Sequence, residues 1–267
     1  MDQRWHADRL RVLTPEESAP RRLPLESLVF DEDRVLLDGV LIGCPGPPSH
    51  ALLNKPKFVT STASDPRGKS DLSPYLRAMP AGCFAVGRLD RETTGLLLFT
   101  NDGDLATAVL RPDHSTTKTY WLWLDEVLDD DDPRLVEFRT GITHNGQRMT
   151  AQSAHIRART DYATELELTL TQGKKRQIRH MCRALELRLV HLHRYRIGPL
   201  SDAGLELGSW RTLGASEVEA LWQAAGGRSA LRQRQVAALV QQAAQARAGG
   251  SPHARLEEWL KLESTAR

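Results

Sequence analysis

The chain has 267 residues, of which 40% are hydrophobic, and its 36 basic and 34 acidic residues leave a net charge of +2. This length allows one large domain or two small ones, and the composition is that of a folded protein rather than a disordered chain. The longest apolar run, near Leu96 to Phe99, has about five residues against the roughly 18 that a membrane span needs, so no transmembrane helix is predicted.

The N-terminal residues contain no hydrophobic signal region. Cys44, Cys83 and Cys182 are odd in number and far apart, which suits neither a disulfide framework nor a zinc site. We therefore expect reduced thiols in a cytoplasmic protein.

Residues 1–49 are rich in proline and arginine, with one alternating apolar segment near Val35 to Ile42. This pattern predicts an N-terminal arm, a short hairpin and a linker. Ala51 to Leu53 then predict a buried strand that ends before Pro56, with Lys55 at the end of the strand. The polar segment 61–74 is rich in turn residues and predicts an irregular loop.

Residues 87–103 place reactive side chains beside a buried strand. Phe84 to Val86 predict a strand that leads into this segment, and the wholly apolar run Leu96 to Phe99 predicts a central strand. The loop between them carries Asp90 among arginines, whose positive charge favours the ionised carboxylate. An ionised carboxylate can act as a nucleophile or as a base, so Asp90 is a candidate reactive group.

Further elements follow in order. Asn101 or Asp102 is expected to cap a helix over 105–110, and 118–124 predict a strand with Tyr120 and Leu122 on one face and Trp121 and Trp123 on the other. The remaining predicted elements are a helix from Pro133 to about Arg139, strands over 151–158 and 163–171, a strand at LGSWRTL (207–213), and a helix over 216–225.

Residues 173–200 predict a basic helix and a strand. Ile178, Met181, Cys182 and Leu185 recur at helical spacing and should face a core. Between residues 173 and 196 there are eight Lys or Arg and one acid, Glu186, so positive charge is concentrated here. Such a concentration is typical of a surface that binds a polyanion, although a charged run is more often a solvated helix face.

Four motifs occur along the chain in this order: LLNKP (52–56), GRLDRETTGLLLFTNDG (87–103), KTY (118–120) and GKKRQIRHM (173–181). Together they resemble the pseudouridine synthases of the RsuA/RluB/RluE/RluF type, which act on ribosomal RNA. The likeness spans about residues 50–222 and is greatest to the RluE-like members, which modify large-subunit ribosomal RNA. It implies an α+β fold with a mixed, mainly antiparallel sheet in two subdomains around a central catalytic cleft.

The resemblance also implies a division of the chain. Residues 1–49 form an N-terminal arm and short hairpin, too short and proline-rich for the full S4 RNA-binding domain that many members carry. Residues 50–225 form the pseudouridine synthase catalytic domain. Residues 226–267, which are rich in Ala, Gln and Arg, form a helical C-terminal extension.

Residue roles follow from the same resemblance. Asp90 matches the catalytic aspartate, Tyr120 the tyrosine that stacks on the target base, and Arg179 the basic residue that pairs with the aspartate. Arg88 matches the arginine that helps to hold the flipped-out nucleotide, and Lys55 belongs to a motif that shapes the wall of the site. The other predicted substrate-binding residues are the polar and basic side chains Lys174, Lys175, Arg176, Gln177, Arg183 and Arg194.

The implied reaction isomerises uridine to pseudouridine. It breaks the C1′–N1 bond, rotates the uracil and rejoins it through C5, and because it is redox-neutral no cofactor or metal is expected. The carboxylate either attacks C1′ or removes the 2′ proton, and the sequence leaves both routes open. The expected partner is ribosomal RNA, as structured RNA or in a ribosomal particle, and the protein is expected to be a monomer that does not bind membranes.

Other interpretations stay open at this point. Without the resemblance, Tyr120 would be assigned to the core and Arg179 could be one more phosphate contact. A non-catalytic RNA-binding or ribosome-assembly factor could keep the same fold. A glycosidase could use Asp90 and Glu92, but these residues lie two positions apart on one loop and are poorly constrained as the opposed pair that such hydrolysis needs.

Overall fold

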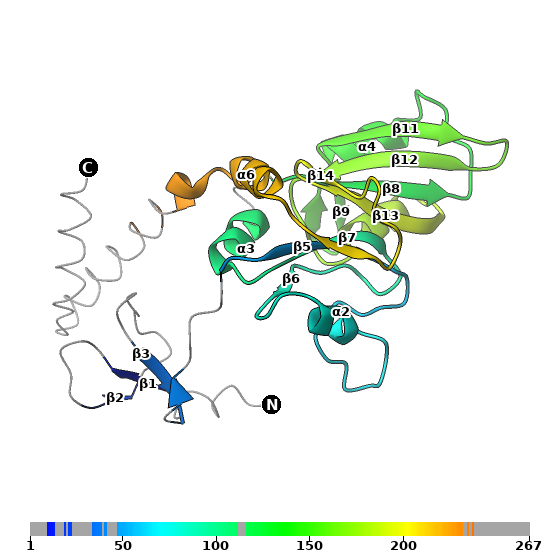
Figure 1. Cartoon of the computed structure of the whole chain (residues 1–267). Coiled ribbons are helices and arrows are strands. Elements are labelled where there is room, and N and C mark those ends of the chain that lie inside the picture. Colours follow the sequence, from blue (N-terminus) through cyan, green and yellow to red (C-terminus); the bar gives the residue numbers. More distant parts are fainter. Residues whose placement is uncertain are drawn as a thin grey trace. The chain divides into compact units, whose positions relative to one another are not determined.

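The computed structural model describes residues 47–111 and 116–231, together with residues 10–13, 19, 21–22, 34–38, 40–41, 234 and 237. The chain divides into two compact units, Met1–Pro47 and Pro48–Arg267, and Figure 1 labels most of their elements. Most of the helical extension predicted for residues 226–267 lies outside the described residues.

The first unit contains a four-stranded sheet with the order β2-β1-β3-β4. Its strands are β1 (Leu10–Leu13), β2 (Arg21–Arg22), β3 (Arg34–Leu37) and β4 (Val40–Leu41). β3 and β4 pair in antiparallel fashion where the sequence predicted a hairpin. β1 and β2 were not predicted, because two to four residues are too few to show a period.

The second unit is built on a nine-stranded sheet with the order β11-β12-β8-β13-β7-β5-β15, in which β14 also pairs with β13 and β6 with β7. Its strands are β5 (His50–Lys55), β6 (Phe84–Val86), β7 (Thr94–Thr100), β8 (Lys118–Leu124), β11 (Ser153–Arg159), β12 (Thr164–Leu170), β13 (Leu189–Ile197), β14 (Leu200–Ser201) and β15 (Trp210–Thr212). The sheet is mixed and mainly antiparallel, as predicted.

The pairing of β7 with β13 is parallel. It joins one half of this sheet, which contains β11, β12, β8 and β13, to the other half, which contains β7, β5 and β15. Its register places His193 beside Thr94 and Arg194 beside Gly95. Gly95 has a φ of +106°, and a Cβ atom at this position would lie 2.2 Å from the backbone oxygen of Arg194. Only glycine can therefore occupy this position without moving one of the two strands.

Helices pack on the sheet and form three separate hydrophobic cores with it. They are α2 (Ser73–Ala78), α3 (Gly103–Leu110), α4 (Pro133–Thr140), α5 (Gln177–Ala184) and α6 (Ala215–Ala224). α4 and α5 pack on β8, β12 and β13, while α3 and α6 pack on β7, and residues around α2 cover the other face of β5 and β7. The half with β8 and β12 thus has one hydrophobic core, and the half with β5 and β7 has one on each face.

Local signals predicted most of these elements. Asp102 caps α3, since its side chain accepts hydrogen bonds from the backbone amides of Asp104 and Leu105 at 3.0 Å. Pro133 opens α4 as predicted. The short helix α2 was not predicted and begins at Ser73, within the segment expected to be irregular.

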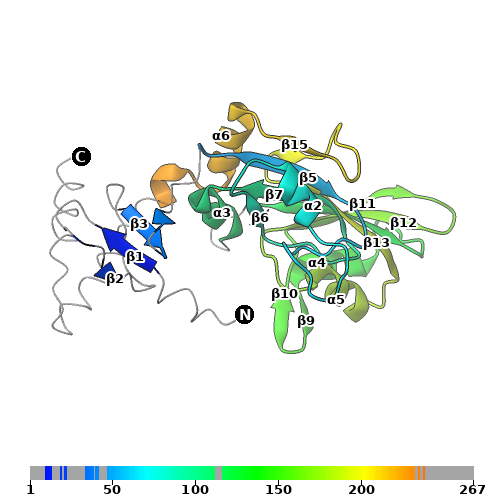
Figure 2. The same ribbon diagram turned by 60° about the horizontal axis from the view of Figure 1, so that its bottom comes forward.

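A hairpin of β9 (Ile142–His144) and β10 (Gln147–Met149) was also missed. Its turn is Asn145-Gly146, and both residues have positive φ. This dipeptide is the strongest short sequence signal for a hairpin, so the element could have been predicted. Figure 2 shows the hairpin beside α5, which β9 contacts.

Candidate active site

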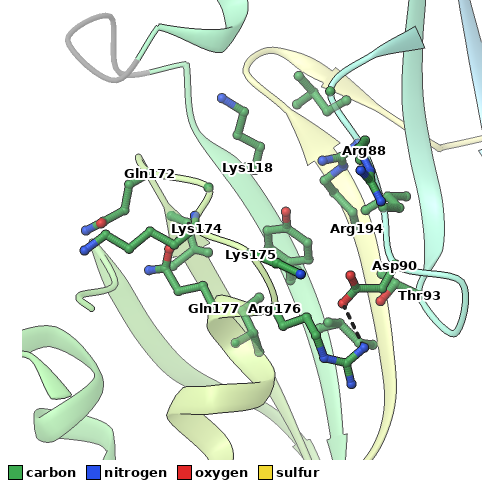
Figure 3. A pocket seen from close by; sticks show the side chains of 18 of the residues that line it. Arg88, Asp90, Thr93, Lys118, Gln172, Lys174, Lys175, Arg176, Gln177 and Arg194 are labelled. Carbon is green, nitrogen blue, oxygen red and sulfur yellow. Dashed lines mark hydrogen bonds and ion pairs between the residues drawn. The ribbon is translucent and has the colours of Figure 1, made fainter. Parts of the chain in front are cut away.

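A cavity of about 730 Å³ lies where the two halves of the nine-stranded sheet meet. It is bounded by the β6–β7 loop, by β8 and β13, and by the segment that leads from β12 into α5. Figure 3 shows its lining. Among the described side chains that line it, Asp90 is the one acid, whereas seven are basic: Arg88, Lys118, Lys174, Lys175, Arg176, Arg179 and Arg194.

The loop that carries Asp90 is held by hydrogen bonds from the segment after β5. The Ser61 hydroxyl donates to the Leu89 carbonyl at 2.7 Å and accepts from the Leu89 amide at 3.1 Å. The amide of Phe58 donates to the Arg91 carbonyl at 2.7 Å. These contacts on both sides of Asp90 fix the backbone that presents its carboxylate to the cavity.

Two arginines of the basic segment approach the Asp90 carboxylate. Arg179 Nε lies 3.5 Å and Arg176 Nη1 lies 3.9 Å from Asp90 Oδ2. Arg176 also lies 3.8 Å from Glu92 Oε2. It precedes α5 with a φ of +54°, which is uncommon for a residue other than glycine. The loop and α5 therefore meet through opposite charges.

Tyr120 lies on β8, directly opposite Arg194 of β13, and both side chains line the cavity. Two residues earlier on the same face, Lys118 also lines the cavity, and its ammonium donates to the Val109 carbonyl at 3.1 Å. Burial, with a smaller effect of the nearby Arg194, lowers the pKa of Lys118 to about 8. Lys118 was not among the predicted site residues, although its spacing from Tyr120 on a strand could have indicated it.

Comparisons with known proteins bear on this geometry. Residues 49–184 match the family model described as RNA pseudouridylate synthase. The chain belongs to this family. A ribosomal small subunit pseudouridine synthase A of Vibrio parahaemolyticus is 32% identical over 186 residues, which cover 69% of this chain and 78% of that protein.

Further likenesses agree with the assignment. The protein of the same name from Escherichia coli is 31% identical over 193 residues, covering 71% of this chain and 81% of that protein. A crystal structure described as a pseudouridylate synthase has a TM-score of 0.60 and 25% identity, covering 80% of this chain and 89% of that one. The predicted family, enzyme class and α+β fold are thereby confirmed.

The other residues predicted to bind substrate in this synthase fall into two groups. Arg88, Lys174, Lys175, Arg176, Gln177 and Arg194 line the cavity. Gln177 is also tied to the protein, because its Nε2 donates to the Thr150 carbonyl at 3.1 Å and its Oε1 accepts from the Lys174 amide at 3.1 Å. Arg183 is exposed on α5 and does not line the cavity.

Lys55 of the synthase is completely buried and likewise does not line the cavity. Its ammonium donates to the carbonyls of Pro56 and Val59, each at 2.9 Å. Burial lowers the pKa of Lys55 to about 8, although the nearby Glu92 acts in the opposite direction. In this structure the Lys55 ammonium holds the chain that follows β5, and its contact with substrate stays a prediction.

The opposite face of β8 and β13 carries aromatic and histidine side chains. Trp121 stacks on Tyr195 with ring centroids 4.3 Å apart. His191 and His193 both hydrogen-bond to the Thr94 hydroxyl, at 3.1 and 2.7 Å. Among the described residues of the synthase no group of three or more His, Cys, Asp or Glu could hold a metal ion, and no helix there is long and apolar enough to span a membrane.

Proposed function

We propose that this protein converts uridine to pseudouridine in ribosomal RNA, with Asp90 acting on the ribose of a flipped-out nucleotide. The main support is that, among the described residues that line the cavity, Asp90 is the one carboxylate and seven others are Lys or Arg. Such a cavity attracts an RNA backbone through its charge and offers a single acid to the sugar.

The proposed roles follow from the positions of the side chains. Asp90 attacks C1′ or removes the 2′ proton, and Arg179, whose Nε lies 3.5 Å away, fixes the orientation of its carboxylate. Tyr120 offers a ring on which the extruded base stacks, and such stacking contributes about 1 to 3 kcal/mol per base. This is comparable with the few kcal/mol that extrusion costs, so phosphate contacts must supply the remaining binding free energy.

Two observations point to different ribosomal subunits as the source of the target RNA. The two relatives compared above are named for the small ribosomal subunit, whereas the sequence motifs suggested a large-subunit target. We expect the target uridine to lie in ribosomal RNA. The motifs predict RNA of the large subunit, whereas the names of the relatives favour RNA of the small subunit. We further propose that the protein acts as a monomer in the cytoplasm.

Two competing functions fit the cavity less well. A non-catalytic RNA-binding or ribosome-assembly factor would not need Asp90, Tyr120 and Arg179 to converge on one cavity. A glycosidase requires two opposed carboxyl groups, but Glu92 does not line the cavity and its side chain is 43% exposed.

The test is a comparison of wild-type protein with Asp90→Asn and Glu92→Gln. Pseudouridines are mapped in both ribosomal RNAs from cells that lack the protein and then contain each form of it. We expect wild-type and Glu92→Gln protein to add a pseudouridine that Asp90→Asn does not add. Pseudouridine formed at the wild-type level by Asp90→Asn would refute the proposal, and the mapped position would identify the subunit.

A further inference from the structure

The part of the cavity around Tyr120 contains two cations that the proposed roles leave unused. Lys118 lies on the same strand face as Tyr120, and Arg194 lies directly opposite Tyr120 on β13. Figure 3 shows both side chains at the cavity, on neighbouring strands. No carboxylate other than Asp90 lines the described cavity, so these two charges are not neutralised by an acid of their own.

Arg194 is poorly satisfied by the protein. Its side chain is almost completely buried, with 6% of the residue exposed. Nε donates to the Leu96 carbonyl at 2.8 Å, but the buried Nη2 has no hydrogen-bond partner among the described residues. Leaving a buried charged donor unpaired is unfavourable, which indicates that a ligand completes this site.

Lys118 also has donors to spare. An ammonium carries three N–H groups, and the described residues provide one acceptor, the Val109 carbonyl at 3.1 Å. Lys118 and Arg194 are close enough to influence each other electrostatically. Two like charges in a partly desolvated cavity repel one another, and an anionic ligand between them would relieve that repulsion.

The surroundings favour a flat base over a phosphate group as this ligand. Ile197 lies directly opposite Lys118 on β13, and Val109 accepts the hydrogen bond from the Lys118 ammonium. Both are apolar and line the cavity together with Leu98, Leu110 and Leu192. Such a wall would leave most oxygens of a phosphate without partners, whereas it suits the faces of a pyrimidine ring.

We infer that Lys118 and Arg194 donate hydrogen bonds to the carbonyl oxygens of the target uracil and stabilise the negative charge that the base acquires when it leaves the ribose. This inference rests on the proposed function. It makes both residues catalytic, because their contacts strengthen as charge develops on the base.

The chemistry balances without a further reactant. When the C1′–N1 bond breaks, its electron pair leaves with the uracil and is shared by N1 and the two carbonyl oxygens. The ribose is then held either as an ester of Asp90 or, after loss of the 2′ proton, as an unsaturated sugar. When C5 bonds to C1′, the ester bond between C1′ and Asp90 breaks and frees the carboxylate, or, on the other route, the unsaturated sugar regains its proton at C2′. C5 then releases its proton and N1 takes one, so the base ends neutral and nothing is oxidised or reduced.

The experiment compares Lys118→Met and Arg194→Met with wild-type protein in single-turnover reactions. One substrate is the RNA with uridine at the mapped target, and the other carries 5-fluorouridine there, because fluorine withdraws electrons and stabilises the anionic base. We expect each variant to lose about 10²-fold in the rate of C1′–N1 cleavage on uridine and clearly less on 5-fluorouridine. Lys118→Arg keeps the charge and should keep most of the rate. Arg194→Lys keeps the charge but not the two directions of the guanidinium, and its rate should lie between those of wild type and Arg194→Met.

The controls separate this inference from the proposed function. Lys69→Met changes an exposed lysine outside the cavity and should leave the rate unchanged. Equal losses on both substrates, or a loss confined to RNA affinity as for a phosphate contact, would overturn the inference while wild-type activity stands. Wild-type protein that forms no pseudouridine would overturn the proposed function. If thermal melting shows that Arg194→Met is not folded, the comparison of Lys118→Met with wild type decides whether the inference holds.

Discussion

Arg179 joins α5 to the loop that carries Asp90. Its Nε lies 3.5 Å from Asp90 Oδ2, and its Nη2 donates to the hydroxyl of Thr93 at 3.2 Å. The Thr93 amide in turn donates to the Asp90 carbonyl at 3.0 Å. One guanidinium therefore contacts both the proposed reactive carboxylate and the turn that presents it.

Replacing Arg179 by Met should reduce the rate of pseudouridine formation far more than RNA affinity. The variant loses both contacts, so the carboxylate is no longer oriented, and we expect a loss of about 10²-fold or more in single-turnover rate. Arg179→Lys keeps the charge but cannot donate in two directions as a guanidinium does, so its rate should lie between those of wild type and Arg179→Met. Rates are measured at saturating protein. A loss confined to affinity would indicate that Arg179 is a phosphate contact instead.

Replacing Gly95 by Ala should destabilise the protein severely. The new Cβ would lie 2.2 Å from the backbone oxygen of Arg194, at a φ of +106° that alanine rarely adopts. We expect a loss of about 3 kcal/mol or more in the free energy of unfolding, measured with urea. Gly103→Ala is the matched control, because no atom lies within 4 Å of its added Cβ. A similar stability for the two variants would contradict the strand register described here.

The buried Lys55 should make stability depend on pH in the alkaline range. Its pKa is about 8 in the folded protein and 10.5 as the ordinary value. Between these values the unfolded chain binds more protons than the folded one, so the free energy of unfolding should rise with pH. This gain is absent below about pH 8 and complete above about pH 10.5.

Lys55→Met isolates this effect from that of other titrating groups. The difference in free energy of unfolding between wild type and variant should shift in favour of wild type as the pH rises from about 7.5 to 9.5. Urea unfolding at several pH values measures it. A difference that does not change with pH would show that the ammonium of Lys55 is not desolvated.

Arg183 should contribute to RNA binding through charge alone. It is exposed on α5 and lies outside the cavity, so Arg183→Ala should leave the single-turnover rate at saturation unchanged. The slope of log affinity against log salt should fall in magnitude by about 0.7 to 0.9, the value for one lost phosphate contact. Arg77→Ala, at an exposed position of α2, serves as the control, and an equal slope for both variants would exclude Arg183 from the interface.

Local sequence patterns predicted the elements that carry the site, since those signals lie within a few residues of one another. The alternation of 118–124 predicted β8, and of the two expected helix caps, Asn101 or Asp102, the structure has Asp102. The association of Asp90 with Arg179 was expected from the resemblance to a family, and the two side chains are 3.5 Å apart.

The contacts that the sequence did not predict depend on long-range packing, although Arg194 itself was predicted as a site residue and lines the cavity. Arg194 contacts the carbonyl of Leu96, 98 positions away, and no local pattern encodes that the two strands run parallel there. Lys55 was expected at the end of its strand and in the wall of the site, and it is buried because the chain after Pro56 folds back over its ammonium. Both outcomes follow from which strands become neighbours, which sequence reasoning about single elements does not determine.

The order of the strands limits how the protein can be shortened. β13 lies between β8 and β7, and β15 and α6 return to the first half of the sheet to cover its edge and its core. All three come after residue 184, where the match to the family ends. A fragment of residues 49–184 would lack the strand that joins the two halves of the sheet and would expose core residues of both halves to water. We therefore expect the smallest folded unit to extend at least to the end of α6.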